Sequence, residues 1–215
     1  SFSHHGKHYD IPPRVTYRGN LLEDITLVPR PKHLPVECWQ PIVSSSKRGI
    51  DLMIKHGIKA ISGGTRSIVE AWRDAQARAG RETQLGEDFI IIEPFFIAES
   101  RENAPEEARI YFEEHTKVVG PLGLLGGLTE EQMKDLESPT QELWPTLPTV
   151  EDAVSAGGLL CGTPEQIIEP LKEFQDLYPG LREFIILPFL STPINVVLEQ
   201  IERFAEEVIP AFEGR

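Results

Sequence analysis

Short apolar runs alternate with longer amphipathic segments along most of the chain. The apolar runs predict strands, and apolar positions that recur every three to four residues predict helices. The expected strands span residues 36–43, 58–61, 89–97 and 183–190. The expected helices span residues 47–55, 67–79, 105–118, 164–177 and 193–212. Helices of this length between consecutive strands require crossover connections, and therefore a parallel sheet.

Two stretches break this rhythm. Residues 1–34 are rich in proline, glycine and histidine and lack helical periodicity, which indicates a hairpin or lead-in segment. Residues 119–160 combine a glycine-rich apolar loop with two short helices, which begin at Thr129 and Thr149. We expect this second stretch to be an insertion that can close as a lid. The chain thus divides into a lead-in at 1–34 and a main body at 35–215.

The strand count decides between two kinds of parallel α/β fold. No Gly-x-Gly-x-x-Gly sequence follows any expected strand, which disfavours an open dinucleotide-binding sheet. The expected strands are too few for a closed (β/α)8 barrel, which takes ~250 residues. We therefore expect an α/β fold of the (β/α)8 TIM-barrel type, of which the chain forms the C-terminal half with about four β/α units.

A serine-rich turn follows the first expected strand and opens a helix. Ser44, Ser45 and Ser46 offer hydroxyl groups there, Lys47 adds a cation, and Gly49 lets the backbone approach a ligand. The free N–H groups and the positive dipole end of a helix N-terminus favour anions. The turn therefore predicts a phosphate site, and the alternative is ordinary helix capping by one serine.

The next expected strand ends at a pair of glycines. In β/α barrels the carboxyl ends of the strands carry the active site. Gly63 and Gly64 would let a ligand approach the backbone there, and the alternative is a plain turn capped by Thr65 or Ser67. Trp39, late in the preceding strand, is a candidate to flank a ligand ring or else a core residue.

Glu93 interrupts the most apolar run of the chain. An unpaired buried charge is costly, so this carboxylate is expected to face the barrel lumen or to pair with a cation. It is a candidate site residue with a raised pKa. The alternatives are a structural ion pair and a solvated strand end.

Composition narrows the possible partners. A formal net charge of −13 argues against nucleic acid and anionic membranes, which both need a basic surface. No apolar run approaches the ~20 residues that span a bilayer, and the first residues do not form a signal peptide, so we expect a cytoplasmic protein. His4, His5 and His8 match no standard metal-site spacing, and no metal is expected.

Several motifs, in this order, resemble the C-terminal half of luciferase-like monooxygenases. They are found at residues 2–10, 28–31, 35–40, 44–49, 160–168 (LCGTPEQII) and 178–181. The resemblance implies a (β/α)8 barrel that binds FMN, or alternatively the deazaflavin F420, and oxygenates a small organic substrate with O2 and reduced flavin supplied by a reductase. It places the flavin phosphate at Ser45 and Ser46, with Ser44, Lys47 and Gly49 close by.

The same resemblance puts the usual acid/base residues in the N-terminal half of the family's barrel, so no catalytic residue is named. Two other functions remain open. One is a non-catalytic flavin-binding half barrel that pairs with another half, and the other is a β/α-barrel enzyme acting on a phosphorylated metabolite. An open sheet exposes its edges, so we expect a homo-oligomer or a complementary N-terminal half as partner.

Overall fold

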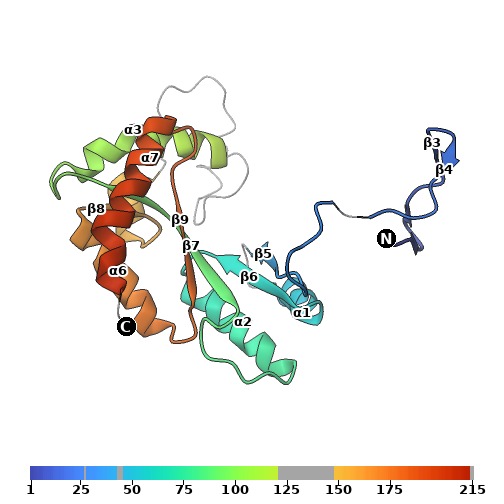
Figure 1. Cartoon of the computed structure of the whole chain (residues 1–215). Coiled ribbons are helices and arrows are strands. Elements are labelled where there is room, and N and C mark those ends of the chain that lie inside the picture. Colours follow the sequence, from blue (N-terminus) through green and yellow to red (C-terminus); the bar gives the residue numbers. More distant parts are fainter. Residues whose placement is uncertain (27, 43–45, 121–147, 214–215) are drawn as a thin grey trace. The chain divides into compact units, whose positions relative to one another are not determined.

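The computed structural model describes residues 1–26, 28–42, 46–120 and 148–213 (Figure 1). The chain divides into two compact units, Ser1–Glu37 and Cys38–Arg215. The first unit consists of short antiparallel hairpins, with a bridge between Phe2 and Ile25. Its strands are β1 (His4–His5) paired with β2 (Asp10–Ile11), and β3 (Thr16–Tyr17) paired with β4 (Asn20–Leu21).

The second unit is built on a five-stranded sheet. Every strand pair in it is parallel, as the spacing of the expected helices predicted. The strand order is β5-β6-β7-β8, and β9 also pairs with β7. The strands are β5 (Cys38–Pro41), β6 (Ile58–Ser62), β7 (Phe89–Ile97), β8 (Leu160–Gly162) and β9 (Glu183–Leu187).

Helices connect consecutive strands, so the expected succession of β/α units is confirmed. In Figure 1, α1 and α2 lie beside β6, whereas α3, α6 and α7 gather at the other end of the unit, near β8. After α7 the chain continues as a π-helical turn and a 3-10 turn to Phe212. The helices are α1 (Lys47–Lys55), α2 (Arg66–Arg78), α3 (Ala104–Val119), α5 (Val150–Ser155), α6 (Pro164–Leu177) and α7 (Ile194–Arg203).

Several elements differ from the sequence prediction. The strand expected at 36–43 is shorter, and β9 ends at Leu187 because Pro188 has no N–H to donate to a neighbouring strand. Strand β8 was not predicted, since three residues are too few to show a period. The short helix that begins after Thr149 is confirmed, whereas the one expected at Thr129 lies outside the described residues.

The core lies between the sheet and the helices. Trp72 of α2 is almost completely buried, donates from Nε1 to the Glu87 carbonyl oxygen at 3.0 Å, and makes an edge contact with Phe89. A second part of the core joins β7 and β8 to α6 and to Val208. Burial of these large side chains is the main favourable term that holds the helices on the sheet.

Strand β7 is covered on both of its edges. Ile90 and Ile91 pair with β6 and also with β9, so these two strands flank β7. Further along, the buried side chain of Gln200 in α7 binds the backbone of Ile97. Gln200 Oε1 accepts from the Ile97 N–H at 2.6 Å, and its Nε2 donates to the Ile97 carbonyl oxygen at 3.0 Å. A helix side chain thus satisfies backbone groups that a further strand would otherwise pair.

Leucine in place of Gln200 should leave the buried Ile97 N–H without a partner. We expect the free energy of unfolding to fall by about 1–3 kcal/mol, the usual cost of an unsatisfied buried group. Urea denaturation measures this, with Glu199→Ala as the control because Glu199 is the exposed neighbour on the same helix. Equal urea midpoints for Gln200→Leu and wild type would show that this contact does not stabilise the fold.

Candidate functional site

The carboxyl ends of β5 and β6 are tied together at one edge of the sheet. Parallel register places Pro41 opposite Ile61. Beyond this pair, Ile42 donates its N–H to the Ile61 carbonyl oxygen at 2.8 Å, and the Ser62 hydroxyl donates to the Ile42 carbonyl oxygen at 2.7 Å. In the sequence the three serines begin two residues after Ile42. These bonds therefore fix the point from which the candidate phosphate site extends.

The beginning of α1 is open. Ser44 and Ser45 lie outside the described residues, and Ser46 is the exposed N-cap of the helix. Within the described part of the chain, the Ser46 hydroxyl makes no capping hydrogen bond. A side chain added at the exposed Gly49 would meet Ser46 Oγ at 4.0 Å, in ordinary contact. As far as the described residues go, the first N–H groups of α1 and the Ser46 hydroxyl are therefore available to an anion.

Lys47 directs its ammonium group along α1. Its Nζ forms a short ion pair with Asp51, which also accepts a hydrogen bond from Arg78 Nη2 at 3.1 Å. The hydrogen bonds from Lys47 and then Arg78 lower the pKa of Asp51. In this arrangement Lys47 offers an anion its backbone N–H, and its ammonium group contacts Asp51.

The turn after β6 is held tightly. The Gly64 N–H donates to Glu93 Oε1 at 2.8 Å, and the Tyr178 hydroxyl donates to the Gly64 carbonyl oxygen at 2.8 Å. A Cβ atom at Gly64 would lie 2.4 Å from Cε1 of Phe174, and one at Gly63 would lie 3.3 Å from Glu93 Oε1. The packing therefore leaves no room for a Cβ atom at Gly64 unless Phe174 moves, and little room for one at Gly63.

Glu93 does not face the barrel lumen, contrary to expectation. By strand alternation it shares a side with Ile91 and Phe95, which pack against helices. Only 6% of its surface is exposed, and its carboxylate accepts from the Gly64 N–H and pairs with no cation among the described residues. Burial raises the pKa of Glu93, and the Gly64 hydrogen bond opposes this shift.

Replacing Glu93 by glutamine should stabilise the protein increasingly as the pH rises. A carboxyl whose folded-state pKa is raised contributes stability below its unfolded pKa, near 4.5, and that contribution is lost as pH rises through the folded pKa. Glutamine stays neutral and keeps an oxygen for the Gly64 N–H. Urea midpoints at pH 5 and pH 8 should show the larger gain at pH 8. Glu183→Gln, at an exposed position of β9, is the control and should show no such trend.

The family follows from comparison with known proteins. The model of the luciferase-like monooxygenases matches residues 2–179. The chain belongs to the luciferase-like monooxygenase family. No curated protein sequence matches it. The parallel sheet of β/α units that the sequence predicted is thus the fold type of this family.

Solved structures of luciferase-like and related enzymes share this fold. The oxygenating constituent of 3,6-diketocamphane monooxygenase from the CAM plasmid of Pseudomonas putida, solved with FMN, has a TM-score of 0.61 and 17% identity, covering 97% of this chain and 57% of that one. EDTA monooxygenase from Chelativorans sp. BNC1 has a TM-score of 0.54 and 18% identity, covering 99% and 50%. A riboflavin lyase solved with modified FMN and riboflavin has a TM-score of 0.55 and 19% identity, covering 98% and 47%. The chain spans about half the length of these proteins.

Trp39 is not a fully buried core residue in this luciferase-like chain. Its side chain is half-buried, and Lys59, its partner in the parallel register, places Nζ 4.8 Å from the centre of the indole ring. Lys59 Nζ also lies 3.5 Å from Asp88 Oδ1. Trp39 thus keeps an exposed part, and its role beside a flavin ring stays a prediction.

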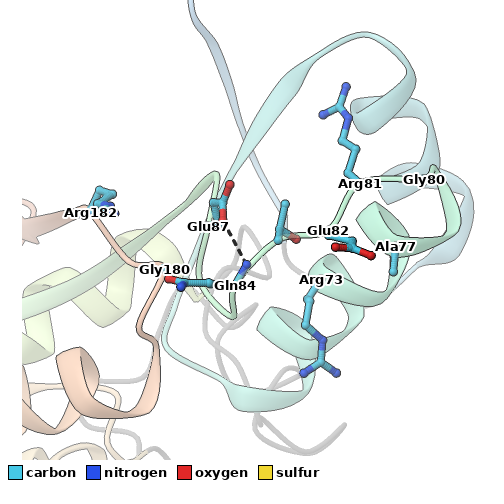
Figure 2. Close-up of a pocket in the computed structure, with 10 residues that line it drawn as sticks. Arg73, Ala77, Gly80, Arg81, Glu82, Gln84, Glu87, Gly180 and Arg182 are labelled. Carbon is cyan, nitrogen blue, oxygen red and sulfur yellow. Dashed lines mark hydrogen bonds between the residues drawn. The ribbon is translucent and has the colours of Figure 1, made fainter.

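A separate cavity of about 1000 Å³ lies at the other end of the strands. Its lining comes mainly from the loops that precede β7 and β9, and Figure 2 shows the hydrogen bond there from the Gln84 N–H to Glu87 Oε2, 3.0 Å long. Three arginines and two glutamates line it, so its charge is nearly balanced. In β/α barrels this end of the strands serves stability, and the candidate site remains at the opposite edge.

Sequence reasoning missed the side chains that brace the glycine turn. Tyr178 lies 114 residues from Gly64 along the chain, and the sequence indicated it only as part of the family motif at 178–181. Phe174 reads as one apolar position on a helix, and Ser62 as the residue before two glycines. No local pattern signals contacts of this range. The described residues contain no cluster of ligands suited to a metal and no helix able to cross a membrane.

Proposed function

We propose that this chain forms the phosphate-binding portion of a flavin-dependent monooxygenase that acts on a small organic substrate. The open beginning of α1 at Ser46, beside the joined ends of β5 and β6, carries this proposal. FMN is the proposed cofactor, and the deazaflavin F420 is the alternative because it also carries a phosphate. The family membership supports a flavin of either kind.

The residues at the sheet edge fit such a cofactor. Ser46 and the serines before it would donate hydroxyl and N–H hydrogen bonds to the phosphate, and the open space at Gly49 would let the group approach the helix. The Gly63–Gly64 turn would face the ring, with Trp39 as a candidate second wall. Reduced flavin supplies the electrons with which O2 is activated, while the protein binds, orients and excludes water.

Absorbance and fluorescence titrations test the proposal. We expect the purified chain to quench FMN fluorescence in a saturable way. The titration should saturate at about one flavin per chain, because a protein has few sites of this kind. F420 added in a parallel titration decides between the two cofactors. Binding of a phosphorylated sugar without binding of either flavin would contradict the proposal and favour an enzyme of phosphorylated metabolites.

Oxygen consumption separates catalysis from binding alone. With a flavin reductase and NADH present, an active monooxygenase should add substrate-dependent O2 uptake to the background of free reduced flavin. Flavin binding without any such increase would favour a non-catalytic half barrel.

One observation favours that second function, a half barrel that pairs with another β/α half. Ile194, Leu198 and Ile201 lie on one face of α7 and are 71%, 59% and 44% exposed. Among the described residues, β5 ends the strand order of the sheet. An exposed apolar helix face and an open sheet edge each suit a second copy or a complementary N-terminal half. Sedimentation velocity should show association that Leu198→Lys weakens, and a wild-type monomer at high concentration would contradict self-pairing.

A further inference from the structure

Gly64 is held from three directions. Glu93 of β7 accepts from its N–H at 2.8 Å, and Tyr178, just after α6, donates to its carbonyl oxygen at 2.8 Å. The ring of Phe174 covers its Cα so closely that no Cβ atom would fit. Phe174 is itself stacked on Tyr178, with ring centres 6.1 Å apart. Two distant elements therefore fix the position of one residue, Gly64, through the peptide groups on both of its sides.

Glutamate is an unusual residue type for a buried side chain that accepts a hydrogen bond from a backbone N–H. A buried carboxylate in an apolar strand lowers stability unless it is fully compensated, and here its bond is with one backbone N–H. A small polar residue would satisfy that N–H at a lower cost. The carboxylate also lies close to Gly63, since a Cβ there would stand 3.3 Å from Glu93 Oε1, a tight contact. The arrangement constrains both glycines of the turn at once.

We propose that Glu93 is a positioning residue, which holds the Gly63–Gly64 turn in the shape that receives the flavin ring. This inference rests on the proposed function. Ser46 at the start of α1 acts on the phosphate end of the cofactor, whereas Glu93 acts through the turn on the ring end. The two ends can be separated experimentally, because riboflavin has the same ring as FMN and lacks the phosphate.

The test measures the dissociation constants of FMN and riboflavin for wild type, Glu93→Gln, Glu93→Leu and Tyr178→Phe. Leucine removes the acceptor, and we expect it to weaken both flavins by about tenfold, the equivalent of one good hydrogen bond. Glutamine keeps an acceptor oxygen and should restore both affinities to within about twofold of wild type. Tyr178→Phe removes the hydrogen bond to the Gly64 carbonyl oxygen and should also weaken both flavins, which keeps the test decisive if Glu93→Leu does not fold.

The visible circular dichroism of the bound flavin supplies a second readout, because it reports the surroundings of the ring. It should change in Glu93→Leu and Tyr178→Phe and be unchanged in Glu93→Gln. Wild-type flavin binding that Glu93→Leu and Tyr178→Phe leave intact would overturn the positioning role while the proposed function stands. Failure of wild type to bind either flavin would overturn both.

Discussion

Aspartate in place of Ser46 should weaken FMN binding about a thousandfold. The new carboxylate would stand at the N-cap of α1, where the phosphate is proposed to bind. Two unit charges about 4 Å apart repel by ~4 kcal/mol at an effective dielectric constant of 20, and each ~1.4 kcal/mol changes a dissociation constant tenfold. Aspartate is also a good N-cap, so the helix itself should persist. Fluorescence titration with FMN measures the change.

Riboflavin is the matched ligand control for this variant. Since it has no phosphate, its affinity should be the same for Ser46→Asp and wild type. Ser46→Ala removes one neutral hydrogen bond and should weaken FMN only about fivefold. Equal losses for FMN and riboflavin in Ser46→Asp would mean that the substitution disturbs the fold and that no phosphate binds at this helix.

Alanine in place of Gly86 should lower the free energy of unfolding by about 2–5 kcal/mol. Gly86 has φ +90°, a region that costs an L-residue ~1–2 kcal/mol. The added Cβ would also lie 2.9 Å from Tyr178 Cβ and 3.1 Å from the Leu181 N atom, and such crowding costs ~1–3 kcal/mol more. Because a domain is stable by only ~5–15 kcal/mol, this single methyl group is a large perturbation.

Gly80→Ala separates the two causes. Gly80 has φ +80°, and a Cβ there meets nothing within 4 Å. Its substitution should therefore cost only the backbone part, ~1–2 kcal/mol. Urea denaturation of both variants measures the difference. Equal destabilisation would show that the segment before β7 can move away from Tyr178 and that the two are not tightly packed.

Sequence patterns predicted the β/α units well where the elements were long. The continuous run at 89–97 and the periodic segment from Arg66 to Arg78 each carry enough residues to show their type. Strand β8 has three residues, one of them Gly162, and its contacts with β7 come from tertiary structure. Short elements of this kind have no period to detect.

The candidate site was predictable only in its local parts. The serine turn and the glycine pair are contiguous motifs whose place at strand ends follows from the parallel sheet. The direction of the Glu93 side chain was not predictable. The expectation that it faces the lumen or pairs with a cation followed from the sequence of its own strand alone. The Gly64 N–H that donates to Glu93 belongs to the turn after another strand, and Tyr178 lies after a third element, α6.

The affinity of wild type for FMN relative to riboflavin tests the central claim most directly. Isothermal titration calorimetry under identical conditions isolates the contribution of the phosphate group. If the start of α1 binds that phosphate through its N–H groups and Ser46, FMN should bind at least about tenfold more tightly than riboflavin, the equivalent of one or two charge-assisted hydrogen bonds. Equal affinities, or no binding of either flavin, would contradict a phosphate site at this helix.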